Sequence, residues 1–360
     1  MATTYKTFLN DDTTNTRTML HEAIPLTGTI VSGTYYLDSS QTQTNIKRYA
    51  HGMFESVYDY PYLSSSANHI FDLTVGYSSK SVLSSSANNG NTKKIQIYTE
   101  MAQVLVGYDQ TGSIRRFDQN GDFTDGGAKL DECFFVNYAR LLNKDEIKKG
   151  SYVLNMYLGG QPKILSNATA IGDYGAASSF KTNSPAGEYG ILYTSSATPM
   201  GDGTSGVGLI YYQAGVAVLT SSIFQVTGDM SRFGPNDAAF GTSVGFRNVA
   251  ACITGSAITA SCEGFRNRWE DNDFNNTTEL NSTIYFCRAS HNEFNYSSNP
   301  TYVSASKIRV KNEALDQPVS YVTTIGLYSQ NNELLAVAKL SEPTKKTPAN
   351  EVTYRVRLDY

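Results

Sequence analysis

The stretch GVGLIYYQAGVAVLT, residues 206–220, places two apolar runs, VGLIYY and VAVLT, on either side of Gln213-Ala214-Gly215. Branched and aromatic side chains favour β-strands, and a three-residue hairpin loop needs a residue such as glycine that adopts a left-handed backbone. Neither run alternates between apolar and polar residues, so both faces of each strand are expected to be buried. The stretch therefore predicts a β-hairpin inside a core.

The sequence on both sides of this hairpin is also typical of β structure. Residues 151–264 consist of short apolar runs separated by Gly, Ser and Asn clusters, a pattern typical of antiparallel sheets. STIYFCR (282–288) predicts a strand, and SYVTTIGLYSQNNELLAVAKL (320–340) predicts a second hairpin that turns at residues 330–332. EVTYRVRLDY (351–360) alternates strictly between apolar and polar residues, which predicts a half-buried strand that ties the C-terminus into a sheet.

The first 150 residues combine both kinds of pattern. LTGTIVSGTYYL (26–37) predicts a strand. In KKIQIYTEMAQVLVG (93–107) and CFFVNYARLLNKDEIKKG (133–150), apolar residues recur at three- and four-residue spacing, which predicts two helices. The predicted fold is mainly β, with antiparallel, sandwich-like sheets and a mixed α+β N-terminal part. The expected domains are an α+β domain (1–150), a Gly/Ser-rich antiparallel β domain (151–264) and a C-terminal β domain with an extended arm (265–360).

The composition points to contacts with other proteins. Charged residues make up 17% of the chain, and tyrosine alone numbers 25; tyrosine suits contacts that bury one end of a side chain and leave the other wet. The net charge of -4 supplies no basic field, so nucleic-acid binding is not expected. No run approaches the roughly 20 apolar residues that span a bilayer, and the N-terminus lacks a signal pattern. We therefore expect synthesis in the cytoplasm and no membrane span.

The metal-binding residue types are scattered along the chain. The cysteines, none of them in a CxxC pair, are expected to be buried reduced thiols: Cys133, Cys252, Cys262 and Cys287. The histidines have no metal-binding spacing, and hydrogen-bonded structural roles are favoured over catalysis: His21, His51, His69 and His291.

Residues 241–245, GTSVG, match the G-x-S-x-G pattern of α/β-hydrolases. In such an enzyme Ser243 would be the nucleophile, with Asp271 or Asp273 and then His291 completing the triad. That fold needs repeated βα units, which the flanking sequence lacks, so a glycine-punctuated turn is favoured.

The stretch FDQNGDFTDGG (117–127) resembles a calcium-binding loop. Its candidate ligands are Asp118, Asn120, Asp122 and Asp125. Phe123 stands where an EF-hand loop needs glycine, and the closing glutamate is missing. A polar loop is favoured, and we expect no catalytic residue, metal or cofactor in this protein.

The segment HNEFNYSSNPTYV (291–303) is dense in polar and aromatic groups. Because Pro300 favours an extended backbone before it, the segment is interpreted as an arm anchored by Phe294, Tyr296 and Tyr302 on a neighbouring subunit or the adjoining domain. Trp269, the only tryptophan, is a further candidate for an interface or a sugar contact, or else a packed ring.

Several stretches are similar to segments of structural proteins from T-even-like myophages, cyanophages among them. They are LHEAIPLTGTIVSGTY, GMFESVYDYPYLSSSANHIFDLTVGYS, KLDECFFVNYARLLNKDEIKKG, GLIYYQAGVAVL, HNEFNYSSNPTY and the segment 321–360. The resemblance covers most of the chain. Residues 325–343, IGLYSQNNELLAVAKLSEP, also look like a hairpin of contractile-tail baseplate and fibre-attachment proteins.

This resemblance implies a viral structural protein of the virion, with a role in tail assembly of a myovirus. It implies a place in the contractile tail of a bacteriophage, in the baseplate first, and no enzymatic activity. The expected partners are other tail and baseplate proteins, in multiple copies with six-fold symmetry. The alternatives are a neck or connector structural protein, a β-rich host-glycan receptor-binding protein, and a hydrolase that uses Ser243.

Overall fold

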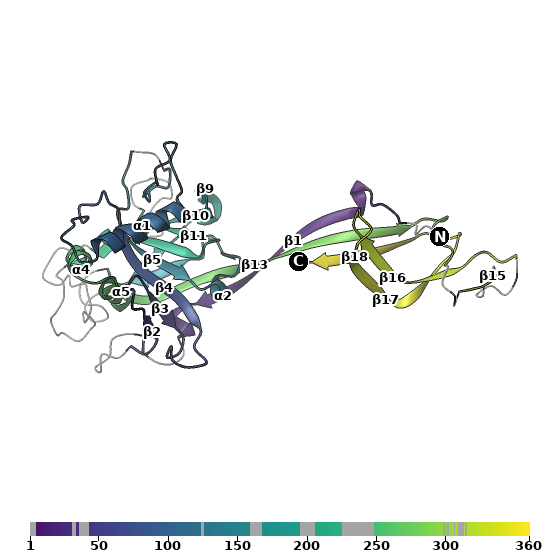
Figure 1. Ribbon diagram of the computed structural model, residues 1–360, viewed down its shortest axis with the longest axis horizontal. Helices are drawn as coiled ribbons and strands as arrows, with labels where there is room; N and C mark the ends of the chain where they lie inside the picture. Colours follow the sequence, from purple (N-terminus) through teal and green to yellow (C-terminus); the bar gives the residue numbers. More distant parts are fainter. Residues whose placement is uncertain are drawn as a thin grey trace. The chain divides into compact units, whose positions relative to one another are not determined.

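The computed structural model describes residues 5–30, 34–35, 43–123, 126–158, 168–194, 206–224, 248–297, 300, 302–305, 307–308, 313 and 315–360. These residues form two compact units: a large unit, Leu20–Thr278, and a small unit that joins Met1–Met19 to Glu279–Tyr360. The chain passes from one unit to the other in two strands, β1 (Thr13–Pro25) and β13 (Trp269–Ala289), which are neighbours in one sheet (Figure 1).

An eight-stranded antiparallel sheet forms the centre of the large unit, in the order β2-β3-β4-β5-β12-β11-β10-β9. Its strands are β2 (Ile46–Arg48), β3 (Glu55–Tyr58), β4 (His69–Tyr77), β5 (Glu132–Tyr138), β9 (Lys181–Ser184), β10 (Gly187–Leu192), β11 (Gly208–Tyr211) and β12 (Val216–Thr220). The predicted hairpin is confirmed as β11 and β12: every residue of both strands is buried, and Gly215 has φ +67°.

Helix α1 (Asn91–Leu105) packs against β4 and confirms the helix predicted at 93–107. Gly76 of β4 makes the close approach possible, since a Cβ there would lie 2.6 Å from the Lys94 carbonyl oxygen. Helices α4 (Val249–Gly255) and α5 (Ile258–Asn267) pack on each other, and α5 also packs on β4.

A second sheet has the order β1-β13-β7-β8, with β6 and β18 also paired to β13. Its remaining strands are β6 (Glu146–Ile147), β7 (Val153–Met156), β8 (Thr169–Gly172) and β18 (Val352–Asp359). The predicted C-terminal strand is confirmed: β18 runs antiparallel to residues 282–289 of β13, and Tyr354 and Val356 are buried while Thr353 and Arg355 are exposed.

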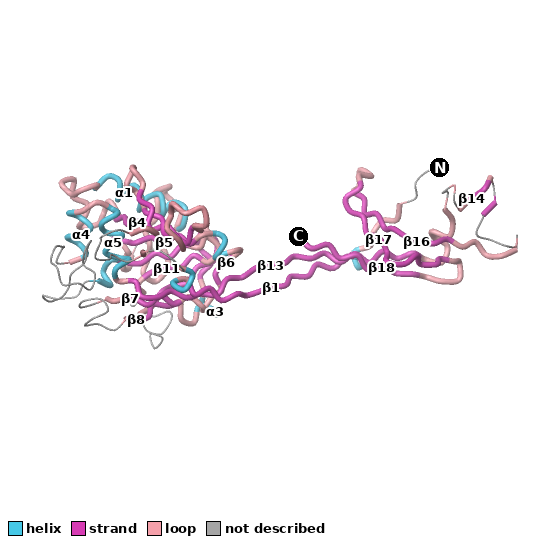
Figure 2. The backbone as a smooth tube through the Cα atoms, turned by 90° about the horizontal axis from the view of Figure 1, so that it is seen from below, coloured by secondary structure: helices cyan, strands magenta, loops and turns pink. Residues whose placement is uncertain are grey.

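The small unit also contains the second predicted hairpin, formed by β16 (Ser320–Tyr328) and β17 (Leu334–Lys346). Asn332, in the predicted turn, has φ +63°. A short strand pair, β14 (Val303–Ser304) and β15 (Lys307–Ile308), precedes it. The described residues are thus mainly β with antiparallel sheets, as predicted; Figure 2 shows how few of them are helical.

Two predictions of secondary structure are wrong. Residues 133–150 do not form one helix; they continue β5, form the short helix α2 (Arg140–Asn143) and end with β6. The reason is that Cys133–Val136 is apolar on both sides and lies between β4 and β12, where both faces are buried. Thr27–Thr29 form a 3-10 helix and not part of a strand, and residues 31–33 and 36–37 lie outside the described residues.

The division into domains also differs from the expectation. Both expected boundaries, after residues 150 and 264, fall inside the large unit. The eight-stranded sheet combines β2–β5, which precede residue 150, with β9–β12, which follow it. Among the described residues a separate α+β N-terminal domain is therefore not seen, because its strands share a sheet with the segment after it.

Candidate functional site

A polar cavity of about 410 Å³ lies beside α1 in the large unit. Three segments line it: the turn after β4, part of α1, and the chain between α1 and β5. The lining residues are Ser78, Ser79, Lys80, Tyr98, Thr99, Ala102, Asp109, Ser113, Ile114, Arg115, Arg116, Phe123 and Lys129.

Tyr98 is a fixed part of the cavity wall. Its hydroxyl donates to the carbonyl oxygen of Leu130 at 2.8 Å and accepts from the amide of Phe117 at 3.2 Å. Burial raises the pKa of Tyr98 well above its ordinary value. The hydroxyl therefore stays protonated and positions the loop that carries Arg116.

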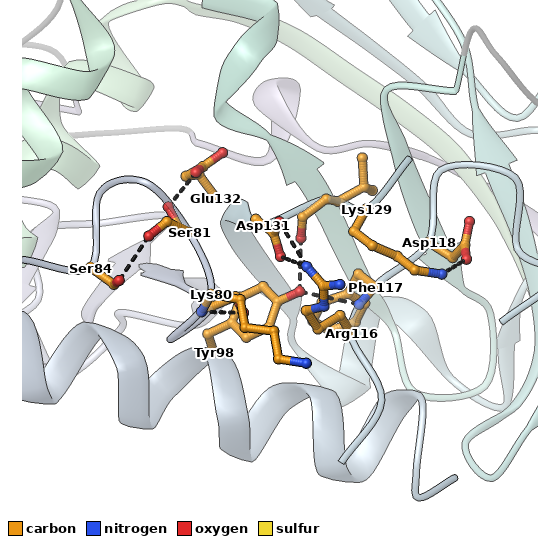
Figure 3. A network of polar contacts seen from close by, with 12 residues as sticks. Lys80, Ser81, Ser84, Tyr98, Arg116, Phe117, Asp118, Lys129, Asp131 and Glu132 are labelled. Atoms are coloured by element: carbon orange, nitrogen blue, oxygen red, sulfur yellow. Dashed lines mark hydrogen bonds and ion pairs between the residues drawn. The ribbon is translucent and has the colours of Figure 1, made fainter. Parts of the chain in front are cut away.

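Two of the four cations in the lining are held by carboxylates. Arg116 donates to both carboxylate oxygens of Asp131 at 3.0 Å, and Lys129 pairs with the buried Asp118. Figure 3 shows these pairs side by side next to Tyr98.

The other two cations, Lys80 and Arg115, have no carboxylate within ion-pair distance among the described residues. The Arg115 guanidinium lies 6.0 Å from the ring centre of Phe123. Asp109 accepts hydrogen bonds from the Thr111 hydroxyl and from the amides of Thr111 and Ser113; these bonds, with the nearby Arg115, lower the pKa of Asp109. The lining is therefore richer in positive than in negative charge.

Phe123 of the calcium-like loop lines this cavity, and the described part of the loop does not gather metal ligands. Asp118 is paired with Lys129, and Asn120 donates to Asp122 at 2.9 Å. Asp125 lies outside the described residues, and among those that are described no group of three metal-ligating side chains could hold an ion. Phe123 has φ +57° and stacks on Tyr189, so the described part of the loop holds one aromatic residue in a left-handed backbone.

Each histidine has a local hydrogen-bond partner, as the structural interpretation requires. His21 lies 3.1 Å from the Thr277 hydroxyl, and His51 accepts from the Met53 amide at 3.0 Å. His69 contacts Asp72 at 2.8 Å, and His291 contacts Glu351 at 3.0 Å.

The cysteines are free thiols. Three are buried and Cys287 is half-buried. Burial raises the pKa of Cys133 and Cys262, so both remain protonated. Ser243 and the GTSVG motif lie outside the described residues.

Two of the four candidate interface residues are buried within the chain. Trp269 is 1% exposed and stacks on Phe71, with ring centres 5.0 Å apart, so it is a packed ring and not a surface anchor. Tyr302 is 7% exposed and donates its hydroxyl to the carbonyl of Val319. Phe294 and Tyr296 are exposed, at 45% and 52%.

The start of the expected arm is a turn and not an extended chain. Residues 291–294 turn directly after β13, and Phe294 has φ +54°. Glu293 accepts from Lys6 at 2.5 Å and from the Ser290 amide at 3.0 Å, while Lys346 donates to Asn295 at 2.9 Å. These contacts fix the segment that presents Phe294 and Tyr296. Ser298, Asn299 and Thr301 lie outside the described residues.

The β16–β17 hairpin exposes several large apolar side chains that no sequence motif marks. Leu327 lies opposite Ala336 and is buried, whereas the neighbouring pair, Gly326 and Val337, points to the other face. We define the hairpin patch as Tyr328, Leu334, Leu335 and Val337, which are 44%, 53%, 68% and 51% exposed. The ring of Tyr5 packs on Tyr328 at 4.9 Å.

Comparison with models of protein families, with curated proteins and with solved structures finds no match. Among the described residues, no helix is both long and apolar enough to cross a membrane. The case for function therefore depends on the residues themselves.

Proposed function

We propose that the protein is a structural subunit of a contractile bacteriophage tail, located in the baseplate, and that it works through protein–protein contacts. The observation that carries this proposal is the hairpin patch, whose side chains are about half exposed although they are large and apolar. The proposed location in the tail and the baseplate comes from the resemblance of the sequence to myophage structural proteins.

A strand in an antiparallel sheet commonly buries one face and leaves polar residues on the other. On β17 the exposed side of the sheet carries leucine and valine near the turn, and Lys339 and Ser341 further along. Apolar groups gathered at one place on a surface mark an interaction site more often than scattered ones do. A neighbouring subunit that covers the patch would remove this area from water.

Phe294 and Tyr296 are two further exposed aromatic residues in the same unit. The ion pairs and hydrogen bonds around residues 290–295 hold the backbone that carries these rings, which lowers the entropic cost of binding the segment to a partner. Both surfaces fit a protein that is held in a particle by area and complementarity.

The test compares two pairs of aspartate substitutions in phage that carry the variant gene. Leu335→Asp with Val337→Asp places charge in the hairpin patch and should reduce complete tails by about tenfold or more, since burying an unpaired carboxylate in an interface is costly. Thr323→Asp with Ser341→Asp alters exposed polar positions of the same hairpin and should leave tail yield unchanged. Equal yields from both pairs, with both proteins folded, would remove the patch from the proposal.

A third variant, Phe294→Ala with Tyr296→Ala, asks whether the second pair of rings contributes. It should lower tail yield without lowering the melting temperature of the isolated protein, since both rings are exposed in the chain alone.

A further inference from the structure

The cavity beside α1 is not used by the proposed function. It has the volume of a small-ligand site, where about 300–1,000 Å³ is usual, and its lining is largely polar and charged. A polar cavity of this kind needs an explanation besides packing, because apolar side chains would fill such a space at lower cost.

We propose that this cavity binds a carboxylate group, presented by an acidic side chain of a partner protein or by a small free acid. The proposal rests on the charges that line the cavity and on the way in which they are held.

The charge balance favours a singly charged anion. Lys80, Arg115, Arg116 and Lys129 line the cavity. The carboxylates against them are those of Asp109, in the lining, and of Asp118 and Asp131, which pair with Lys129 and Arg116. Among the described residues, these four cations and three carboxylates leave one positive charge, which one further carboxylate would neutralise.

Two of the four cations are positioned before any ligand arrives. Asp131 holds the guanidinium of Arg116 through both of its oxygens, and Asp118 holds Lys129. Lys80 and Arg115 remain as donors without a carboxylate partner among the described residues. Bonds from ionised donors to a carboxylate are roughly twice as strong as neutral ones.

The same lining disfavours other ligands. A metal cation would meet four positive side chains, and the aspartates next to it are already paired or hydrogen-bonded. A phosphate dianion would bring more negative charge than the cavity leaves uncompensated. Phe123 is a poor platform for a sugar ring, because its ring already contacts the Tyr189 ring and the Arg115 guanidinium.

The test is a titration of the isotope-labelled full chain by nuclear magnetic resonance at constant ionic strength. The probes are acetyl-Gly-Glu-Gly-amide, its neutral counterpart acetyl-Gly-Gln-Gly-amide, sodium propionate and inorganic phosphate. We expect the glutamate peptide to shift the amides of Ser79, Lys80, Ser113 and Arg115 saturably, and the glutamine peptide to leave them unchanged.

Lys80→Met with Arg115→Met should weaken binding of the glutamate peptide by about tenfold or more, the loss expected when charge-assisted bonds are removed. Lys93→Met with Arg140→Met removes the same charge from residues outside the lining and should keep the original affinity. If the first double variant does not fold, Lys80→Met alone replaces it, because Lys80 is exposed.

Binding of propionate as tight as that of the glutamate peptide assigns the site to free acids, and tighter binding of the peptide assigns it to a partner protein. The proposal is overturned if neither carboxylate probe shifts these amides, if phosphate binds more tightly, or if the Lys80 and Arg115 variants bind as the unaltered protein does. None of these outcomes depends on the place of the protein in a phage tail.

Discussion

At the scale of single residues, Asp173 is a buried carboxylate that holds together three segments of the large unit. One oxygen accepts from the Gly150 amide at 2.7 Å and the Tyr212 hydroxyl at 2.8 Å, and the other accepts from the Tyr152 amide at 3.0 Å. Burial outweighs these hydrogen bonds and raises the pKa of Asp173 to about 6.

This raised pKa predicts a particular pH dependence. Because the folded pKa lies above the unfolded value of 3.8, the native state binds more protons between the two. The contribution of Asp173 to stability is fully present below the unfolded pKa and is lost as pH rises through about 6. The stability lost is about 3 kcal/mol.

The measurement compares urea unfolding of the protein and of Asp173→Asn between pH 4 and pH 7. Carboxyls such as Glu22 and Asp109, whose pKa is lowered by hydrogen bonds, contribute with the opposite sign in both proteins. These contributions cancel when the two proteins are compared, so the difference in their free energies of unfolding reports on Asp173 alone. From pH 4 to pH 7 the unaltered protein should lose more stability than Asp173→Asn. Parallel pH profiles would contradict the assignment.

Such buried charges could not be predicted from the sequence. Lys94 is fully buried and donates to the carbonyl oxygens of Asn89, Ile253 and Ser256, and Arg266 pairs with the buried Glu55 at 2.5 Å. Nothing in the local pattern of a Lys-Lys pair or of RNRW separates these side chains from exposed ones. Ile253, Ser256 and Glu55 are distant in sequence from these side chains, and only the fold brings them together.

At the scale of elements, β18 shows how far a local pattern can decide structure. Strict alternation of apolar and polar residues was sufficient to predict the strand and its buried face, and the loop glycine with two apolar runs was sufficient for β11 and β12. The pattern failed at residues 133–150, because Phe134, Phe135 and Tyr138 fit helical spacing as well as a strand buried on both faces. Which of the two forms depends on the neighbouring strands β4 and β12.

The buried face of β18 can be tested by a matched pair of substitutions. Val356 is 7% exposed and lies opposite Tyr285. Its replacement by aspartate should lower the local free energy of unfolding by about 3 kcal/mol, because a carboxylate is then buried without a partner. Thr353→Asp, on the exposed face of the same strand, should cost well under 1 kcal/mol.

Amide hydrogen exchange shows which part of the chain each variant destabilises. In Val356→Asp the amides of residues 282–289 of β13 should exchange faster, while those of β5 and β12 should be unaffected. Equal protection of residues 282–289 in both variants would show that Val356 does not hold β18 on β13.

At the scale of the whole molecule, the sequence predicted the class of fold but not how the chain is divided. The two compact units are each built from segments distant in sequence: the small unit joins the first 19 residues to the last part of the chain. Composition shifts along a sequence cannot show this, because they follow chain order, whereas the units follow strand pairing. The candidate interface residues were divided in the same way: Phe294 and Tyr296 are exposed, and Trp269 and Tyr302 are buried in the chain itself.

The central claim, that the protein is a baseplate subunit held by contacts of its small unit, is tested most directly by cryo-electron microscopy of the phage particle. The proposal predicts density for this chain in the baseplate, in multiple copies related by the six-fold axis, with Leu335 and Val337 covered by a neighbouring subunit. Density confined to the neck, the portal or the capsid, or a hairpin patch facing solvent in every copy, would contradict it.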